Sequence, residues 1–508
     1  MASDSRGQGA AGLLLLVPAL LCQHCGSSQS HANATGGNGG QSNGGSANAG
    51  QPSTSFGGAV TSIPGGPGCG LGDLAAFCDA FDAPAKDRGR AGDLDRTRWS
   101  AARQRPQAPT ANGLTIGIVS TALPGCRADI VNKVFPDQDT AICDPNTGIR
   151  SNHLLVASAA QNYGQNSYRI RQPFDFAGRT GKIVFDAEAY MSALLGWVSV
   201  ELTEDPAPAP SFAVGPSGTA NDEGSAVPRN AIEVQFANDC AGAGEPPLVG
   251  MRMLLTVADY VQTSLKPDSP VCLKAMKGSL NHFEITVSQN RVEIFGSSFS
   301  ADGATFEQPT LLFSSAVDLP FTRGYVHITT HNHATRKYSP NNAMDAWLAR
   351  WDNVGFDGPA ITDFREYEIP DSLVPATSTD FGESEMNIGY LVADAADAPH
   401  DVLHFTGVDP QGMSKARLAL SMWFLQSSSN ASYGLKFRLN GGTWHDRPLT
   451  PAESGQLSDS HSQGAIELMV DVPTSELVSG DNTLEFLTTN VPHNYPPAVS
   501  NIDLVLAK

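Results

Sequence analysis

Residues 321–359 read FTRGYVHITTHNHATRKYSPNNAMDAWLARWDNVGFDGP. In the first part of this stretch, Val326, Ile328 and Thr330 alternate with polar or ring-bearing residues. The alternating polar row consists of Tyr325, His327, Thr329, His331 and His333. Because successive side chains of a β-strand point to opposite faces of a sheet, this period of two predicts a strand with one apolar and one polar face. We therefore expect a sheet whose polar face meets water and serves as a working surface.

Strand-like runs recur at short intervals on both sides of this stretch, and almost no run has the 3.6-residue period of a helix. A strand is expected over 347–356, ending at the turn signal Asp357-Gly358-Pro359. The clearest hairpin spans 282–295, with its turn at 288–290. Further strands are expected at 114–119, 153–157, 167–172, 182–189, 196–203, 231–236 and 251–257. The pattern favours an all-β fold built from antiparallel sandwiches.

Length and charge limit the classes of function. The 508 residues suffice for two or three domains that each bury a core. The chain carries 32 basic and 52 acidic residues, for a net charge of -20. Nucleic acids and anionic membrane surfaces need clustered Lys and Arg, so we expect neither as a partner.

The N-terminus has the pattern of an export signal. Residues 10–21 (AAGLLLLVPALL) form an apolar run of the length of a signal-peptide core, too short to span a bilayer. Cys22 and Cys25 follow it directly, so residues 1–25 resemble a bacterial lipoprotein signal, in which such a cysteine is lipidated. Ordinary cleavage near 32–34 and free secretion is the alternative. Either outcome places the protein outside the cell or on its outer surface.

Residues 26–67 are Gly, Ser, Asn, Gln and Thr with few bulky apolar side chains, which predicts a disordered linker. Six cysteines follow the signal, an even number that in an exported chain predicts three disulfides. Short loops favour pairing in order along the chain. These cysteines are Cys69, Cys78, Cys126, Cys143, Cys240 and Cys272.

Several phrases resemble a known family. The segments 168–176 (YRIRQPFDF), 181–188 (GKIVFDAE), 196–200 (GWVSV) and 351–356 (WDNVGF) are similar to the concanavalin A-like sandwich of the laminin-G and glucanase type. The resemblance implies such a sandwich over residues 68–363. Residues 364–508 hold further strand-like runs, and the phrase at 477–486 (LVSGDNTLEF) resembles accessory jelly-roll modules of carbohydrate-active proteins. A second, smaller jelly-roll-like β-sandwich is therefore expected there.

No catalytic signature is found. A glucanase of this superfamily would carry Glu-x-Asp-x-x-Glu on one strand, and the chain has no such run. Asp186 and Glu188 share one face of an expected strand, and we interpret them as a solvated face. The sequence therefore leaves enzyme status open and favours a protein without catalysis.

The candidate ligand-binding residues lie around the histidine-rich strand. They are Tyr325, His327, His331, His333, Arg336 and Tyr338. Aromatic rings with planar polar groups are typical of saccharide sites, whereas each residue could equally be loop surface. His331 and His333, two apart on a strand, also resemble part of a metal site, but a third ligand is not identifiable. Asp352 and Asn353 are candidate calcium ligands, although two oxygens fall short of the 6 to 8 that the ion takes.

These observations predict an exported, lectin-like protein that binds a glycan or cell-surface polymer. No cofactor is expected beyond the calcium considered above. We expect the protein to contact a membrane only through the N-terminal lipid anchor. Two alternatives stay open: a glycoside hydrolase or polysaccharide lyase with dispersed catalytic residues, and a structural or adhesive surface protein. In the second sandwich, the exposed loop 444–446 (WHD) is a further candidate for ligand contact.

Overall fold

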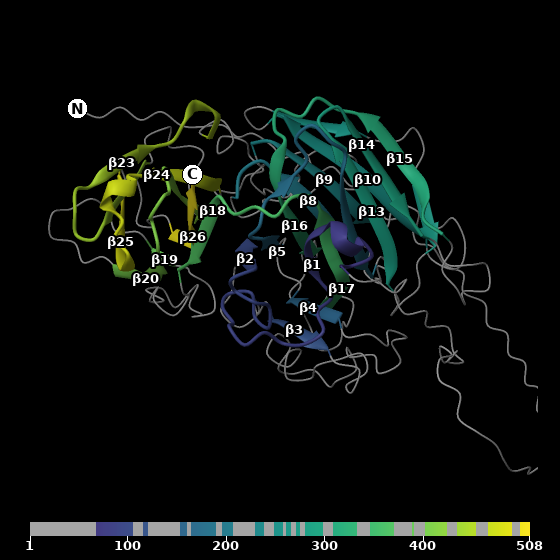
Figure 1. Ribbon diagram of the computed structural model, residues 1–508, viewed down its shortest axis with the longest axis horizontal. Helices are drawn as coiled ribbons and strands as arrows, with labels where there is room; N and C mark the ends of the chain where they lie inside the picture. Colours follow the sequence, from purple (N-terminus) through teal and green to yellow (C-terminus); the bar gives the residue numbers. More distant parts are fainter. Residues whose placement is uncertain are drawn as a thin grey trace, which may run out of the picture. The chain divides into compact units, whose positions relative to one another are not determined.

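The computed structural model consists of antiparallel sheets arranged as two sandwiches, which confirms the all-β prediction (Figure 1). All of the residues that it describes belong to one unit, Ser55–Lys508. These residues are 68–104, 115–119, 153–159, 164–188, 196–206, 229–237, 248–257, 261–265, 271–274, 280–297, 308–332, 346–369, 389–390, 402–423, 434–453, 466–489 and 498–508. The expected signal peptide and linker, with Cys22 and Cys25, lie outside them.

One sheet of the first sandwich has eight strands. In sheet order they are β15 (Thr310–Ala316), β14 (Arg291–Gly296), β13 (Asn281–Ser288), β7 (Gly181–Ala187), β17 (Ala346–Asp357), β4 (His153–Ala159) and β3 (Thr115–Val119), with β1 (Ala75–Asp79) paired to β17. The hairpin expected from the sequence is formed by β13 and β14. Its register pairs Ser288 with Arg291, which leaves Gln289 and Asn290 in the turn.

The other sheet of the first sandwich has nine strands, and the histidine-rich stretch supplies one of them. In sheet order they are β11 (Val261–Leu265), β10 (Leu248–Val257), β9 (Ala231–Ala237), β8 (Gly196–Thr203), β16 (Arg323–Asn332), β5 (Gly164–Ile170) and β2 (Trp99–Gln104), with β12 (Val271–Lys274) paired to β10 and β6 (Phe174–Asp175) to β16. Strand β16 thus lies near the middle of its sheet, between β8 and β5.

The core of the first sandwich is built from the apolar halves of the alternating strands. Val326 and Ile328 of β16 are buried in it, as the alternation predicted. Across the core, the ring of Phe236 in β9 lies 4.3 Å from that of Phe283 in β13, measured between centroids. Trp351 of β17 is fully buried in the same core. Apolar burial of this kind is the main favourable term in folding.

The second sandwich is smaller and has its own core. Its five-stranded sheet runs β18 (Phe364–Glu368), β26 (Ala498–Ala507), β21 (Lys415–Trp423) and β24 (Ile466–Val472), with β19 (Gly389–Tyr390) paired to β26. Its four-stranded sheet runs β20 (Val402–Val408), β25 (Gly480–Thr489), β22 (Gly434–Leu439) and β23 (His445–Pro448). Leu418, Phe437 and Leu504 are among the buried residues that join the two sheets. Two short 3-10 turns are η1 (Gly72–Leu74) and η6 (Thr474–Glu476).

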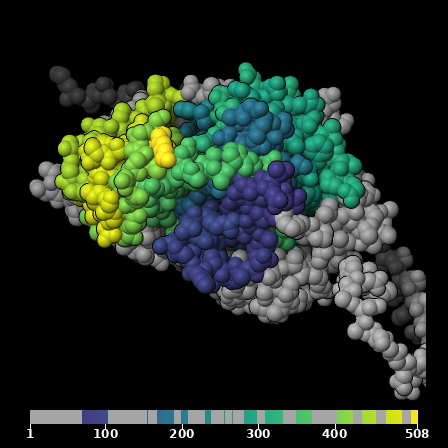
Figure 2. Space-filling view, in the orientation of Figure 1, coloured from purple at the N-terminus to yellow at the C-terminus, as the bar shows by residue number. Residues whose placement is uncertain are grey.

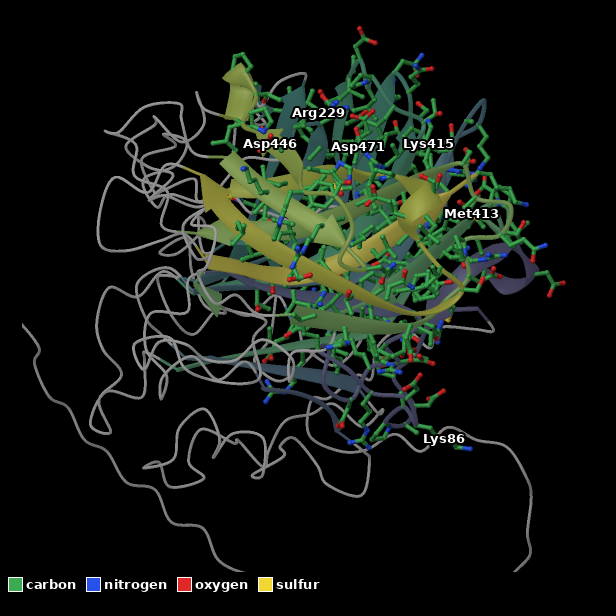
Figure 3. All side chains as sticks on the ribbon, turned by 90° about the vertical axis from the view of Figure 1, so that its left-hand side faces the viewer. Lys86, Arg229, Met413, Lys415, Asp446 and Asp471 are labelled. Carbon is green, nitrogen blue, oxygen red and sulfur yellow. A yellow bond between two sulfur atoms is a disulfide. The ribbon has the colours of Figure 1, made fainter. Side chains whose placement is uncertain are left out.

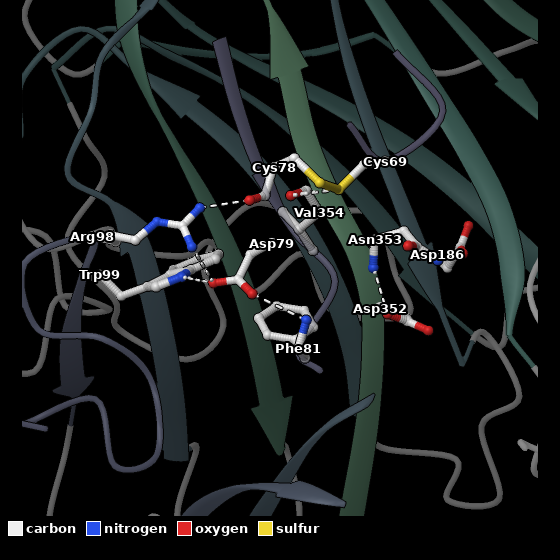
Figure 4. Close-up of a disulfide and its surroundings, with 10 residues drawn as sticks. All are labelled: Cys69, Cys78, Asp79, Phe81, Arg98, Trp99, Asp186, Asp352, Asn353 and Val354. Carbon is white, nitrogen blue, oxygen red and sulfur yellow. Dashed lines mark hydrogen bonds and ion pairs between the residues drawn. A yellow bond between two sulfur atoms is a disulfide. The ribbon is translucent and has the colours of Figure 1, made fainter. Parts of the chain in front are cut away.

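A disulfide fastens the start of the described chain to the first sandwich. Cys69 and Cys78 are bonded, with Cα atoms 5.6 Å apart, in agreement with the expected pairing (Figure 4). Cys78 pairs with Gly355 of β17, where a Cβ atom would lie 2.8 Å from the backbone oxygen of Phe77. Glycine is therefore required for this close approach. Residues 68–104, drawn purple, form part of the molecular surface in Figure 2.

The other expected disulfides lie outside the described part of the chain. This holds for Cys126, Cys143 and Cys240, and for the side chain of Cys272, whose backbone belongs to β12. Among the described residues, no helix is long and apolar enough to cross a membrane.

Candidate functional site

The polar face of the nine-stranded sheet carries four ionisable side chains in a line across four neighbouring strands. Glu233 in β9 pairs with Glu201 in β8, Glu201 pairs with His327 in β16, and His327 pairs with Arg169 in β5. Directly opposite residues of an antiparallel pair have Cβ atoms about 4.5–5.5 Å apart, so their side chains interact. We call these four residues the central row.

A second line of polar residues runs beside the central row. It consists of Gln235, Ser199, Thr329 and Ser167. These side chains support the carboxylates: Gln235 Nε2 donates to Glu233 Oε1 at 3.1 Å, and Ser199 Oγ donates to Glu201 Oε1 at 3.1 Å. All of them are buried. Because unpaired polar groups are costly when buried, such a face needs hydrogen bonds throughout.

Glu201 and Glu233 are two carboxyl groups held together in a dry environment. Burial and the neighbouring charge of Glu233 raise the pKa of Glu201 well above its ordinary value, although hydrogen bonds from Thr329 and Ser199 act in the opposite direction. Two like charges at this separation do not both ionise readily, so the pair tends to share a proton. Among the described residues, Glu201 Oε2 has no hydrogen-bond partner.

His327 is also fully buried, but both of its ring nitrogens have partners. The Thr203 hydroxyl donates to the backbone oxygen of Asp205 at 2.8 Å, so it accepts from His327 Nε2 at 2.9 Å. Nδ1 then faces Ser167 Oγ at 3.4 Å as an acceptor. Burial, and then the charge of Arg169, lower the pKa of His327 well below its ordinary value. The imidazole is therefore neutral and fixed in one tautomer.

Tyr325 lies at the edge of the same face beneath Arg169. The guanidinium carbon of Arg169 is 5.3 Å from the centroid of the Tyr325 ring, a cation–π contact. Burial raises the pKa of Tyr325 to about 12, although the charge of Arg169 acts in the opposite direction. The phenol is therefore un-ionised and packed.

The structure corrects the expectation that this face meets water at the predicted site. The alternation is right, because Tyr325 and His327 point away from the core formed by Val326 and Ile328. Their exposure was predicted wrongly, since His327 is 0% and Tyr325 only 8% exposed. Side chains of His331, His333, Arg336 and Tyr338 lie outside the described residues, so a ligand contact there stays a prediction.

A buried cluster of six charged side chains joins the polar face to the second sandwich. Three arginines, Arg90, Arg169 and Arg171, meet three carboxylates, Glu366, Glu368 and Asp503. We call this group the arginine cluster. Each of these side chains is 5% exposed or less.

The geometry of the arginine cluster is that of strong, paired ions. Arg169 binds Glu366 with two nitrogens, at 2.8 and 2.5 Å, and Arg171 bonds the same carboxylate. Arg90 Nη2 lies 2.8 Å from Asp503 Oδ2. Burial alone would raise the pKa of Asp503, but the three guanidinium groups hold it below its ordinary value. The positive charge of Arg169 is thus neutralised by the second sandwich.

Asp186 and Glu188 are not a solvated face, which corrects the sequence interpretation. Both are buried. Asp186 lies 2.6 Å from His282 Nδ1, and Glu188 lies 2.5 Å from Arg350 Nη1. Burial opposes protonation of His282, but hydrogen bonds with Asp186 and Glu284 outweigh it and raise the pKa of His282 to about 9.

This histidine makes stability depend on pH. Since the folded pKa, about 9, exceeds the ordinary 6.5, the stabilisation is complete below pH 6.5 and is lost as pH rises through 9. The shift corresponds to about 3 kcal/mol. We expect His282→Gln to remove most of the decline in unfolding free energy between these pH values, measured by urea denaturation. His404→Gln, at an exposed position of β20, should keep the wild-type decline.

Asp352 and Asn353, the candidate calcium ligands, form a bulge in β17. Asn353 adopts a φ of 48°, and its side-chain nitrogen donates to Asp186 Oδ2 at 2.7 Å. The carboxylate of Asp352 accepts the backbone N–H of Asn353 at 2.8 Å. Within the described ranges, no group of three or more His, Cys, Asp or Glu residues could hold a metal ion.

In the second sandwich, the exposed loop predicted over 444–446 is corrected by the structure, because His445 and Asp446 belong to β23 and only Trp444 precedes it. The Arg438 guanidinium lies 4.5 Å from the Trp444 ring centroid, and His445 Nε2 lies 2.8 Å from Glu476 Oε1. The Asp446 side chain is 73% exposed and lies at the surface in Figure 3. Trp444 and His445 are thus held by contacts within the second sandwich, and ligand binding there stays a prediction.

Sequence reasoning missed Glu201 and Glu233. Each sits in a run of alternating residues, 198–203 (VSVELT) and 231–236 (AIEVQF), so each looks like an ordinary polar position on a half-buried strand. The signal available was a glutamate in the polar half of two successive strands, which an antiparallel meander would bring side by side.

No protein-family model matches the sequence, and no curated protein matches it. Among solved structures, the carbohydrate recognition domain of Emp47p is 10% identical, over 56% of this chain and 99% of that chain, with a TM-score of 0.30. A family 16 glycosyl hydrolase protein of Mycobacterium smegmatis is 11% identical over 55% and 99%, with a TM-score of 0.28. A family 16 enzyme of Bacteroides ovatus, solved with an oligosaccharide product, is 9% identical over 55% and 98%, with a TM-score of 0.31. With TM-scores of 0.28 to 0.31, these likenesses establish neither the fold family nor the function of this chain.

Proposed function

We propose that the first sandwich binds a neutral glycan on the polar face of its nine-stranded sheet, with Glu201 and Glu233 as the main contacts. The observation that carries this proposal is the buried carboxyl pair, in which Glu201 Oε2 lacks a hydrogen-bond partner among the described residues. Glu201 is 2% and Glu233 1% exposed, so the proposal requires that the cover of this face move aside to admit the ligand. His327 differs, since both of its nitrogens are already bonded.

The chemistry of the face supports a neutral polyhydroxyl ligand. Carboxylates accept hydrogen bonds from sugar hydroxyls, and the serine, threonine and glutamine side chains of the second line both donate and accept. An anionic ligand is disfavoured because Arg169, the cation of the central row, is neutralised by Glu366. A sugar hydroxyl placed against Glu201 Oε2 would complete its hydrogen bonding.

The binding proposal is tested on an array of neutral glycans with the full chain. Loss of a hydrogen bond to a charged group costs about 1.5–3 kcal/mol. For the neutral glycan that the wild type binds on the array, we therefore expect Glu233→Gln to raise the Kd by about 10- to 100-fold. Glu293→Gln, in β14 of the other sheet, is the matched control and should bind as the wild type does. Absence of any neutral glycan binding, or an unchanged Kd for Glu233→Gln, would contradict the proposal.

The same carboxyl pair favours a second candidate, hydrolysis of the bound glycan. Retaining glycosidases place two carboxyl groups about 5–5.5 Å apart, one protonated and one ionised. Side chains on directly opposed strand positions suit that spacing, and the raised pKa of Glu201 suits the acid. Glu201 would protonate the leaving oxygen while Glu233 attacks the anomeric carbon, and a water deprotonated by Glu201 would then displace Glu233 and release the sugar.

Release of reducing ends distinguishes hydrolysis from binding alone. General acids contribute about 10²–10⁴-fold to rate, so Glu201→Gln should lose that factor if the protein is a hydrolase. Tight binding by the wild type without release of reducing ends would contradict hydrolysis and support glycan binding alone.

We further propose that the chain is exported. The Cys69–Cys78 bond supports this, because structural disulfides persist in oxidising compartments. Cell fractionation tests it: a membrane-bound protein released by Cys22→Ser or Cys25→Ser indicates a lipid anchor, and protein in the medium indicates free secretion. Protein retained in the cytosol would contradict export.

A further inference from the structure

The two sandwiches are joined by charged contacts and not by a shared apolar core. One cluster of buried apolar side chains draws its members from residues 77–356 and the other from residues 369–506, so among the described residues neither core includes a side chain of the other sandwich. The strands of the first sandwich end at Asp357 and those of the second begin at Phe364, so residues 358–363 connect them. Separation of the sandwiches therefore exposes ions, which regain water, and leaves both apolar cores closed.

One side of this junction is held firmly. The neighbouring strands β18 and β26 carry Glu366, Glu368 and Asp503, the carboxylates of the arginine cluster. Each of these side chains is 5% exposed or less, and burial protects such contacts from screening by salt. Strand β18 also follows directly on the connecting residues 358–363. The arginine cluster and the chain connection therefore fix the second sandwich on the same side.

The next strand of the same sheet makes a weaker contact. Strand β21 lies beyond β26 and carries Arg417, whose Nη1 lies 2.8 Å from Asp205 Oδ1 of the first sandwich. The two side chains are 35% and 20% exposed, and exposed pairs contribute little to stability. The Thr203 hydroxyl, which accepts from His327 of the central row, donates to the backbone oxygen of Asp205 at 2.8 Å. The weak contact thus lies next to the central row.

Tyr325 lies within reach of both contacts. Burial raises its pKa to about 12, and the charges of Glu366 and Arg417 act on this pKa in opposite directions. Tyr325 pairs with Thr203 and lies two residues before His327 in β16, so it shares the polar face with the central row. Its side chain is only 8% exposed, so a gain in exposure there reports that the second sandwich has moved away.

We infer that the second sandwich is a hinged cover, which pivots on the arginine cluster and opens where Arg417 meets Asp205, so that a glycan enters past Tyr325. The entry of a glycan rests on the proposed function, whereas the motion does not. Arg169 keeps its partner Glu366 during such a motion, so the face still suits a neutral ligand. If only open molecules bind, the observed affinity is the intrinsic affinity multiplied by the open fraction.

Hydroxyl-radical footprinting of the full chain, read by mass spectrometry, tests the motion without a glycan. Asp205→Asn removes the charge but no side-chain bulk, and losing an exposed pair should raise the open fraction, and with it the oxidation of Tyr325, by about 1.5- to 5-fold. Tyr168, fully buried in the first core, should stay unoxidised. Asp409→Asn is the matched control, because Asp409 pairs with Arg365 inside the second sandwich at 2.7 Å. Unchanged oxidation of Tyr325 in Asp205→Asn would overturn the inference.

The same variants test whether this motion controls glycan entry. For the neutral glycan that the wild type binds on the array, we expect the Kd of Asp205→Asn to fall by the factor by which Tyr325 oxidation rises. Asp409→Asn should keep the wild-type Kd. Increased oxidation with an unchanged Kd would overturn the role of the second sandwich as a cover and leave glycan binding intact. Failure of the wild type to bind any neutral glycan would instead remove the proposed function, and the oxidation of Tyr325 would still decide the motion.

Discussion

Replacing Glu366 by alanine is expected to lower the free energy of unfolding by about 3–5 kcal/mol. The carboxylate accepts hydrogen bonds from both Arg169 and Arg171, and its side chain is 1% exposed. Its removal leaves the guanidinium groups of Arg169 and Arg171 buried without the carboxylate that both of them bond. Glu368 and Asp503 remain nearby, but their bonds to Arg171 are longer, at 3.3 and 3.4 Å. Urea denaturation of the two proteins measures the difference.

The control for this prediction is an acidic residue paired with an arginine at the surface. Asp409 lies 2.7 Å from Arg365 and is 51% exposed. Exposed pairs contribute about 0.2–1 kcal/mol, so Asp409→Ala should change stability by no more than that. Equal losses for the Glu366 and Asp409 variants would show that the arginine cluster does not hold the two sandwiches together.

Replacing Glu201 by glutamine is expected to stabilise the fold while weakening glycan binding by about tenfold or more. Because burial raises the folded pKa of Glu201 above 4.5, its ionisation opposes folding. Its contribution is most favourable below pH 4.5 and becomes less so as pH rises through the folded value. Glutamine cannot ionise, so the gain in thermal midpoint should be largest near neutral pH and should vanish in acid.

We expect a residue that serves a binding site to show this opposition, in which its replacement raises stability and weakens binding. A buried carboxylate beside another is locally unfavourable, and such residues persist where the strain serves a site. A glutamine variant that is less stable than the wild type at neutral pH, or that binds glycan equally well, would indicate that Glu201 has a structural role.

Local patterns in the sequence predicted the strands well. The alternation around Val326 and Ile328 placed those residues in the core, and the 282–295 run formed the hairpin β13–β14. Both predictions depend only on the two-residue repeat of a strand, which neighbouring residues display directly. The short loop between Cys69 and Cys78 likewise favoured the bond that is observed.

The sequence could not predict which strands and side chains far apart in the chain lie next to one another. The burial of His327 depends on partners in β5 and β8, and Arg169 meets Glu366 across 197 positions of the chain. Alternation shows which side of a strand is polar, but neither which strand lies beside it nor what covers the face. For that reason the candidate site moved from the histidine-rich segment to Glu201 and Glu233.

The most direct test of the central claim is a carbon-13 NMR titration of the glutamate carboxyl groups, with Glu201 and Glu233 assigned from their glutamine variants. The account predicts that the pair keeps one proton at pH values well above 4.5, with a coupled second step, and that a bound neutral glycan shifts both signals. Two independent carboxyl groups that each titrate near 4.5, with no response to any neutral glycan, would contradict it.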